Sequence, residues 1–432
     1  MRKNNLYSYL FAGLMIVFVF IFASCSTSTP HESSQQTDFE HNNTAEEFSI
    51  ESYTKKIISD EIPLSEYNTQ YKSDTEIVQD TEYPNFNYKN CVFTEFPEIE
   101  ELEVLSGKKH GITVQESWDT IENWLEDIGK QDEINMETDI RVVSQQFDID
   151  ESAEYPNCYV SFYNHIGDLN SGEGAFIDTN KCHIQIAANG IYSMSDGKIT
   201  EYLGYTSMAA LDALGTNSEN VVSQGSLSDT KNKTYPLIDG ELSIDEGALM
   251  VKNYFLEGTP FPCAEGVTVD IPEVKVFKLG DVYGYDYMVR RVYHSVPFAY
   301  MDHGAYQWDE NYIVNADIKH AYVVSCSGVT AYAGYNESEK LLSLYTGEKI
   351  IGLKQMADLV SEKFAPSLSV QVESVELVYF PISFDYFDDK EEKIIFPCWQ
   401  FSGKNEINGK YIRIYADVFT SDIYYYTFNQ ED

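Results

Sequence analysis

Cysteines have the widest choice of chemistry in this sequence, because a thiol can be acylated, oxidised to a disulfide or used to bind a metal. The chain contains seven of them. Cys25 directly follows an apolar N-terminal run, and the other six are spread over the rest of the chain: Cys91, Cys158, Cys182, Cys263, Cys326 and Cys398. No two of these six have C-x-x-C spacing, so the sequence indicates neither a zinc site nor a thioredoxin-like redox site.

Other patterns that would indicate catalysis are absent or incomplete. The sequence has no H-E-x-x-H, G-x-S-x-G or P-loop motif. His294 and His303, with Asp302, are too far apart in sequence to indicate a metal site. We therefore predict no catalytic residue, no metal and no cofactor. A carboxylate pair that hydrolyses glycosidic bonds stays open as an alternative, because 70 acidic residues supply many pairs.

The N-terminus has the anatomy of a secretory signal. Arg2 and Lys3 form a basic start, and an apolar run from Leu10 to Ala23 follows and ends in small residues. A membrane span needs roughly 20 apolar residues, and this run is shorter, so a single-span anchor is the second choice.

The end of that run, Phe22-Ala23-Ser24-Cys25, resembles the lipobox of bacterial lipoproteins, although Phe22 stands where that family usually has Leu. The resemblance implies that residues 1–24 are a lipoprotein signal peptide. It also implies that Cys25 becomes the mature N-terminus and the lipid attachment site, through a diacylglyceryl thioether. Such an anchor places the protein at the extracytoplasmic face of the cell membrane, and two or more acyl chains would hold it stably.

Composition limits what the protein can bind. Acidic residues outnumber basic ones 70 to 29, which gives a net charge of −41. This charge repels phosphate backbones, so nucleic acid is excluded as a partner. Residues 25–75 are rich in Ser, Thr, Gln, Asn and Glu with little periodicity, and we predict that they form a lipidated, disordered polar tether.

Three similar units are predicted behind the tether. Thr113 with Glu116 and Ser243 with Glu246 form capping-box patterns, and Gly352 with Gln355 is a weaker third example. After each cap the apolar residues share one helical spacing, which predicts three amphipathic helices. The apolar positions are Val114, Trp118, Ile121, Leu125; Ile244, Ala248, Val251, Phe255; and Leu353, Ala357, Val360, Phe364.

Segments that alternate with period two, or are rich in Val, Ile, Tyr and Phe, follow each helix and predict strands. The fold class is therefore α+β, with tandem modules of one helix packed on an antiparallel β-meander. The predicted modules are residues 76–215, 235–340 and 341–432. In the last module one face of the strand, with Tyr411, Arg413, Tyr415 and Asp417, is expected to meet solvent or a partner.

The repeat also suggests two disulfides, Cys158 with Cys182 and Cys263 with Cys326, each inside one module. The alternative is that the strand cysteines are free thiols that pack as small buried hydrophobic residues.

The last module resembles PepSY-like modules and the tandem modules of Yyc-type accessory proteins. The matching residues are Pro397, Trp399, Ala416, Asp417, Thr420 and Ile423. The whole plan is similar to uncharacterised lipoproteins of low-GC Gram-positive bacteria. These resemblances imply a non-enzymatic, membrane-anchored protein that binds or regulates an envelope partner. The alternative is a cell-surface glycoside hydrolase or carbohydrate-binding lipoprotein that uses Tyr411 and Tyr415 as stacking platforms.

Overall fold

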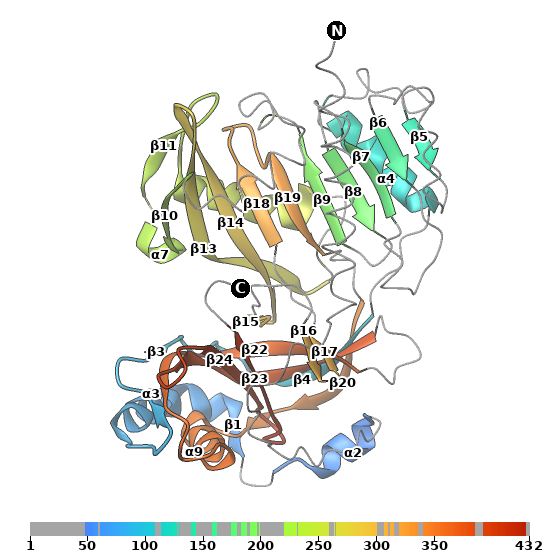
Figure 1. Ribbon diagram of the computed structural model, residues 1–432. Coiled ribbons are helices and arrows are strands. Elements are labelled where there is room, and N and C mark those ends of the chain that lie inside the picture. Colours follow the sequence, from blue (N-terminus) through green and yellow to red (C-terminus); the bar gives the residue numbers. More distant parts are fainter. Residues whose placement is uncertain are drawn as a thin grey trace, which may run out of the picture.

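The computed structural model describes residues 48–58, 61–108, 114–127, 129, 140–143, 158–161, 174–178, 183–187, 191–196, 198, 220–230, 232–258, 263, 265–299, 306–309, 312–314, 319–335, 340–384 and 392–428. Over these ranges the chain has the predicted α+β fold. Most strands belong to two large sheets, one of nine strands and one of ten, which lie one above the other in Figure 1. No helix in the described ranges is long and apolar enough to span a membrane.

The nine-stranded sheet is antiparallel throughout. In spatial order its strands are β10 (Val221–Ser226), β13 (Val267–Leu279), β14 (Val282–Tyr293), β18 (Lys319–Val323), β19 (Ala331–Tyr335), β9 (Ile191–Ser195), β8 (His183–Ala187) and β7 (Gly174–Asp178), with β15 (Val296–Pro297) beside β14. Helices α4 (Val114–Asp127) and α8 (Ile244–Asn253) share one hydrophobic core with this sheet. Smaller elements nearby are β5 (Ile140–Val143), β6 (Cys158–Ser161), α7 (Leu227–Thr230), β11 (Thr234–Pro236) and β12 (Glu241–Ser243).

Helix α8 begins where the sequence predicts. The Ser243 side chain accepts a hydrogen bond from the backbone N–H of Glu246, and the Glu246 carboxylate accepts one from the backbone N–H of Ser243. The helix lies so close to the sheet that a Cβ on Gly247 would clash with the Tyr287 hydroxyl. Tyr287 donates that hydroxyl to the carbonyl of Ile244 at 2.8 Å, which ties the first turn of α8 to β14.

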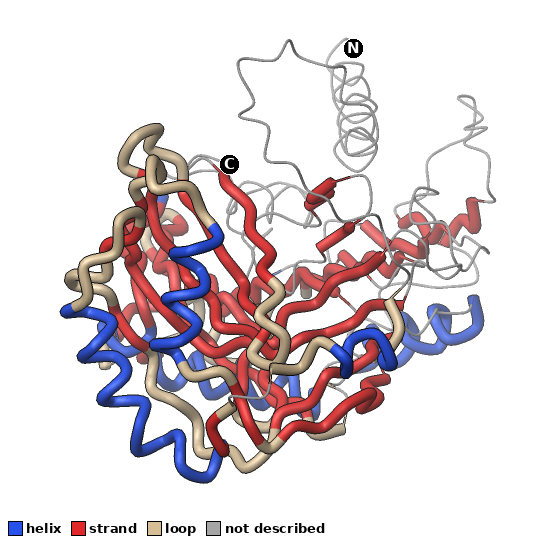
Figure 2. Tube along the Cα trace, turned by 90° about the horizontal axis from the view of Figure 1, so that it is seen from below, coloured by secondary structure: helices blue, strands red, loops and turns tan. Residues whose placement is uncertain are grey.

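The ten-stranded sheet is mostly antiparallel, and only β2 and β3 run parallel to their neighbour β22. Its strands are β2 (Phe86–Asn87), β3 (Val92–Phe93), β4 (Leu102–Lys108), β16 (Tyr306–Asp309), β17 (Tyr312–Val314), β20 (Lys340–Gly347), β22 (Val370–Phe384), β23 (Glu392–Asn405), β24 (Tyr411–Asp417) and β25 (Ile423–Phe428). Helices α2 (Ile50–Lys55), α3 (Leu64–Asp80) and α9 (Leu353–Lys363) lie on the side of this sheet that faces away from the nine-stranded sheet (Figure 1 and Figure 2). Strand β1 (Ile62–Pro63), just before α3, pairs with β21 (Lys349–Ile350), just before α9, and so places the starts of these two helices next to each other.

Helix α9 also begins where predicted, but its cap comes from elsewhere in the chain. Gly352 is the N-cap residue and has no side chain to form a bond. Instead, the hydroxyl of Tyr67 accepts a hydrogen bond from the backbone N–H of Leu353 at 2.6 Å. Asp74 accepts bonds from Tyr67 at 2.9 Å and from the Lys354 N–H at 3.4 Å. Two residues of α3 therefore accept the hydrogen bonds of the first backbone N–H groups of α9.

The predicted tether is too long. The described part of residues 25–75 contains α2 and most of α3, and both helices pack into the core of the ten-stranded sheet. Tyr53, Tyr67 and Tyr71 are at most 6% exposed. Burial of their rings explains why a segment that reads as polar still folds: tyrosine brings a large apolar area together with a hydroxyl that bonds inside the core. The remainder of the predicted tether, residues 25–47, lies outside the described residues, as does the signal peptide.

The predicted module boundaries do not coincide with the sheets. Helix α8 followed by β13, β14, β18 and β19, and helix α9 followed by β22 to β25, are each one helix and an antiparallel meander. However, β9 of the first predicted module pairs with β19 of the second, so these modules share one sheet. Strand β4, also of the first predicted module, pairs with β20 and β23 in the other sheet. Pairing between distant strands follows no local sequence pattern, which is why the boundaries differ.

Candidate functional site between the two sheets

A cavity of about 340 Å³ lies at the junction of the two sheets. Its walls come from β13, β14 and the turn into β15 on one side, and from α3, the loop after β3, β22 and β23 on the other. The lining residues are Tyr71, Thr94, Glu95, Phe96, Pro97, Thr268, Val269, Asp270, Arg290, Val292, Ser295, Pro297, Glu376, Leu377 and Trp399. The volume lies within the range of small-ligand pockets.

Arg290 of β14 forms the main polar contact across the junction. Its Nη1 and Nη2 donate to the two carboxylate oxygens of Glu376 on β22, at 2.9 and 2.8 Å. Its Nε and Nη2 also donate to Asp270 Oδ2 on β13, at 3.3 and 3.2 Å. Burial lowers the pKa of Arg290, but the bonds and charges of Glu376 and Asp270 outweigh burial and raise it. The guanidinium therefore stays charged and joins the two sheets.

Aromatic side chains fix the wall on the side of the ten-stranded sheet. The Tyr71 ring stacks on Trp399, with 5.8 Å between centroids and 5° between planes, and Phe96 packs against both. Trp399 donates its indole N–H to the carbonyl of Ile351 at 3.0 Å. Tyr71 donates to the carbonyl of Thr94 at 2.7 Å, which holds the loop that carries Glu95 in place. Burial raises the pKa of Tyr71, so this hydroxyl stays a donor.

The sheets are also joined beside the cavity. The backbone N–H of Ala299 donates to the carbonyl of Tyr379 at 2.8 Å, and Phe298 forms a parallel bridge with Tyr379. Tyr293 donates its hydroxyl to Glu103 at 2.9 Å. These contacts hold the walls of the cavity together.

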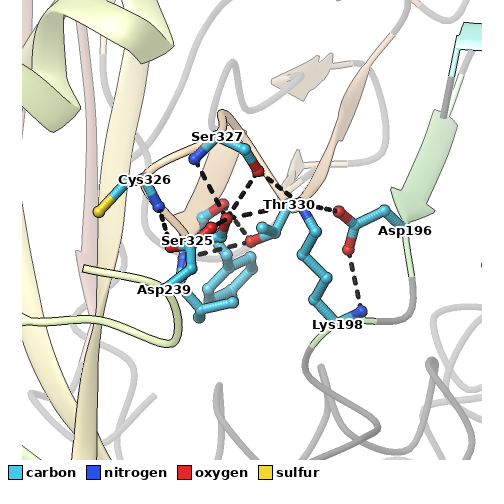
Figure 3. Close-up of polar contacts among 9 residues, drawn as sticks. Asp196, Lys198, Asp239, Ser325, Cys326, Ser327 and Thr330 are labelled. Atoms are coloured by element: carbon cyan, nitrogen blue, oxygen red, sulfur yellow. Dashed lines mark hydrogen bonds and ion pairs between the residues drawn. The ribbon is translucent and has the colours of Figure 1, made fainter.

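A second polar cluster lies at the turn between β18 and β19 and is drawn in Figure 3. Lys198 Nζ donates to Ser327 Oγ at 2.5 Å, and the hydroxyls of Ser327 and Ser325 are 2.6 Å apart. Asp239 accepts from Ser325 Oγ and from the Cys326 N–H, each at 2.7 Å. These two bonds lower the pKa of Asp239.

A serine next to a lysine could form a nucleophile and its base, if the amine were neutral. Here Lys198 Nζ lies 3.3 Å from an Asp196 carboxylate oxygen and donates a hydrogen bond to Ser327 Oγ, so the lysine acts on this serine as a hydrogen-bond donor. The cluster links three chain segments, residues 196–198, Asp239 and the turn at residues 325–327, and we interpret it as a structural contact that fixes this turn.

Several predicted site residues are corrected by the structure. Cys263 and Cys326 are not joined by a disulfide, so the suggested pairing of these two residues is wrong. Cys91 and Cys398 are free and buried, and burial raises the pKa of both thiols, that of Cys91 to about 12. This agrees with the alternative in which strand cysteines pack as small hydrophobic residues. Cys25 and Cys182 lie outside the described residues, and nothing tests the pairing of Cys158 with Cys182.

Of the two tyrosines expected to form a stacking platform, Tyr415 is fully buried, whereas Tyr411 is partly exposed. The Tyr415 ring stacks on Phe380 with 3.9 Å between centroids. Asp417, expected on the same solvent-facing side, is buried too and accepts hydrogen bonds from the Tyr53 hydroxyl at 2.9 and 3.0 Å. Helix α2 and the core of the sheet cover this face. Of the metal candidates only His294 is described, and it lies 3.8 Å from Glu103. Among the described residues no group of three or more potential ligands could hold a metal ion.

Sequence reasoning missed the residues of the cavity, except that Trp399 was noted as part of a family resemblance. A weak signal was present at Arg290, a basic residue inside the apolar strand segment "YMVRRVY" of a strongly acidic chain. A charge in such a strand needs a buried partner, and the sequence does not show where in the chain that partner lies.

No family model matches this sequence, and no curated protein matches it. Among solved structures, part of the chain is similar to the Bacillus megaterium YpeB C-terminal domain. The identity is 12%, the TM-score is 0.17, and the match covers 44% of this chain and 99% of that chain. A likeness of this degree carries no argument about activity.

Proposed function

We propose that this protein is a non-enzymatic lipoprotein with PepSY-like modules, anchored through Cys25 at the extracytoplasmic face of the membrane. We propose that it binds or regulates an envelope partner. The observation that carries the proposal is the cavity at the junction of the two sheets. Both sheets contribute walls, and Arg290 with its two carboxylates holds them in register. A cavity of this kind can bind one group of a partner, and its shape depends on the relative position of the two sheets that form it.

The glycoside hydrolase remains the weaker alternative. Glu376 and Asp270 both line the cavity, but each accepts hydrogen bonds from Arg290. Both carboxylates are therefore already engaged by the Arg290 guanidinium, which competes with the proton donation and nucleophilic attack that glycoside hydrolysis needs. The carbohydrate-binding alternative keeps only Tyr411 of its two expected stacking rings, because Tyr415 is buried.

Site-specific photo-crosslinking in intact bacterial cells tests the binding site. A crosslinking amino acid replaces Thr268, an exposed residue of β13 that lines the cavity. The matched control replaces Lys278, which is exposed near the other end of the same strand and does not line the cavity. We expect an envelope protein to be crosslinked from position 268 and not from position 278. Equal yields from both positions would contradict the proposal, as would cleavage of a cell-wall glycan by the purified chain.

The anchor is tested by Cys25→Ala in the full chain. Because one thioether carries the acyl chains, we expect the variant to leave the membrane fraction and lose labelling by a clickable fatty acid. Retention of the label in the variant would contradict lipidation at Cys25.

A further inference from the structure

We infer that the cavity recognises a cationic group on an aliphatic stem, as found in a lysine or arginine side chain of a peptide or in a free diamine. This inference rests on the proposed function and names the chemistry that its site would bind.

The first step is the charge of the lining. Three carboxylates line the cavity, those of Glu95, Asp270 and Glu376, against one cationic group, Arg290. Lys252 does not line the cavity, but its Nζ forms a long ion pair with Asp270 Oδ1 at 3.9 Å, which leaves Glu95 as the carboxylate without a cationic partner. The balance favours an entering cation, and the net charge of −41 raises the concentration of cations around the protein.

The second step is which charges are already used. Arg290 donates to both oxygens of Glu376 and to Asp270 Oδ2, so its charge is matched and an anion would have to displace a carboxylate. Glu95 is exposed, and no described residue forms a hydrogen bond or an ion pair with its carboxylate. Glu95 therefore provides an unused acceptor for a new positive charge, whereas Asp270 Oδ1 already forms an ion pair with Lys252.

The third step is size and polarity. A cavity of about 340 Å³ is much larger than a metal ion and is small for a folded partner surface. Pro97, Val292, Pro297 and Leu377 supply apolar wall between the charged groups. A lysine or arginine side chain has the matching form, since its methylene stem packs on apolar surface while its charged end stays polar. The geometry favours one basic side chain with its flanking backbone.

The test is isothermal titration of the full chain in non-ionic detergent with blocked tripeptides. The probes are acetyl-Gly-Lys-Gly-amide and its Arg, Glu and norleucine counterparts, and 1,5-diaminopentane represents a free diamine. We expect the Lys and Arg peptides to bind about tenfold more tightly than the Glu and norleucine peptides, and this preference to weaken with added salt. Tighter binding of the diamine than of the peptides would identify a free amine as the ligand, and the reverse a peptide.

Glu95→Gln is the informative variant because Glu95 is exposed and takes no part in the Arg290 contacts. We expect it to weaken binding of both cationic peptides about threefold, as for a partly solvated charge pair. Glu98→Gln is the matched control, since Glu98 is an exposed acid of the same loop that does not line the cavity. Equal effects of the two variants, equal binding of the Glu peptide, or no binding of either cationic peptide would overturn the inference. If crosslinks from position 268 persisted in that case, the proposed function would stand with another ligand.

Discussion

The α8 and α9 meanders share one plan, one helix followed by four antiparallel strands, but their helices are started in different ways. Helix α8 is capped by its own sequence, through Ser243 and Glu246. Helix α9 has Gly352 at the same position, and its first N–H groups are satisfied by Tyr67 and Asp74 of α3. One repeat therefore carries its start signal locally, whereas the other depends on a segment more than 270 residues earlier in the chain.

The different caps explain why the N-terminal helix α3 is an integral part of the fold. By providing the cap for α9, α3 is fixed against the ten-stranded sheet, and Tyr71 of the same helix then forms a wall of the cavity. The α8 meander supplies the other wall through Arg290. The α8 meander and α3 therefore form opposite walls of one cavity.

The largest effect is expected from breaking the ion pair that joins the two meanders at their junction. Arg290→Met leaves the Glu376 carboxylate without its partner, and the side chain of Glu376 is only 15% exposed. Removing one member of a buried ion pair costs about 3–5 kcal/mol of stability. We expect denaturant unfolding, followed by tryptophan fluorescence and circular dichroism, to change from one transition to two. The double variant Arg290→Met/Glu376→Leu serves as control and should recover most of the loss. A single unshifted transition in Arg290→Met would show that this ion pair does not couple the sheets.

The second effect concerns pH in the ten-stranded sheet. Burial raises the pKa of Asp417 to about 7, while bonds from Phe419, Tyr53 and Thr420 partly oppose the rise. Because the folded pKa lies above the unfolded value, the contribution of Asp417 to stability is fully present below pH 4 and is lost as pH rises through 7. The limiting slope for one group is about 1.4 kcal/mol per pH unit.

Asp417→Asn should remove this dependence, measured as the free energy of unfolding from pH 4 to pH 8. The comparison variant is Asp239→Asn, near the nine-stranded sheet, because the pKa of Asp239 shifts in the opposite direction. The pKa of Asp239 is lowered, so its contribution is present above the unfolded pKa and is lost only as pH falls through the lower folded value. If Asp417→Asn left the slope between pH 4 and pH 7 unchanged, the assignment to Asp417 would fail.

The third effect tests the borrowed cap. Asp74→Ala removes the acceptor for the Tyr67 hydroxyl and the Lys354 N–H in a site where Asp74 is 4% exposed. We expect a loss of about 2 kcal/mol in unfolding free energy, the usual cost of leaving buried donors unpaired. Asp74→Asn keeps an acceptor oxygen and should lose clearly less. Equal losses in the two variants would indicate that the packing of α3, and not the cap, is what matters.

The smallest effect tests the local cap. Ser243→Ala removes one side of the capping box, at a cost of about 1 kcal/mol. Hydrogen exchange should show faster opening of the first turn of α8 and no change in α9. The reverse pattern would contradict the assignment of separate caps to the two helices.

Local sequence patterns predicted the local structure well. Cap residues and apolar spacing located α4, α8 and α9, and segments rich in alternating or β-branched residues predicted the strands that follow them, because these signals depend on residues close in sequence. Helix α3 was missed because its buried stripe has two tyrosines and an aspartate between Leu64 and Val78, so it does not read as an apolar face. The disulfide between Cys263 and Cys326 was wrong because a matching position in a repeat does not bring two sulfur atoms together.

The candidate site could not be read from the sequence in the same way. Arg290 and Glu376 are 86 positions apart, and only the pairing of whole strands brings them together. Glu95 depends on the loop held by Tyr71, whose role follows from the docking of α3. Sites formed between sheets depend on tertiary contacts that leave no local pattern.

The most direct test of the account is hydrogen–deuterium exchange of the full chain with and without a saturating concentration of acetyl-Gly-Arg-Gly-amide. This measurement compares the exchange rates at the cavity and at the polar cluster of Figure 3, and so shows which of the two binds the peptide. We predict slower exchange at residues 94–97 and 268–270, and no change at residues 325–327. Protection at residues 325–327 without protection at the cavity would contradict the central claim that the junction of the two sheets is the binding site.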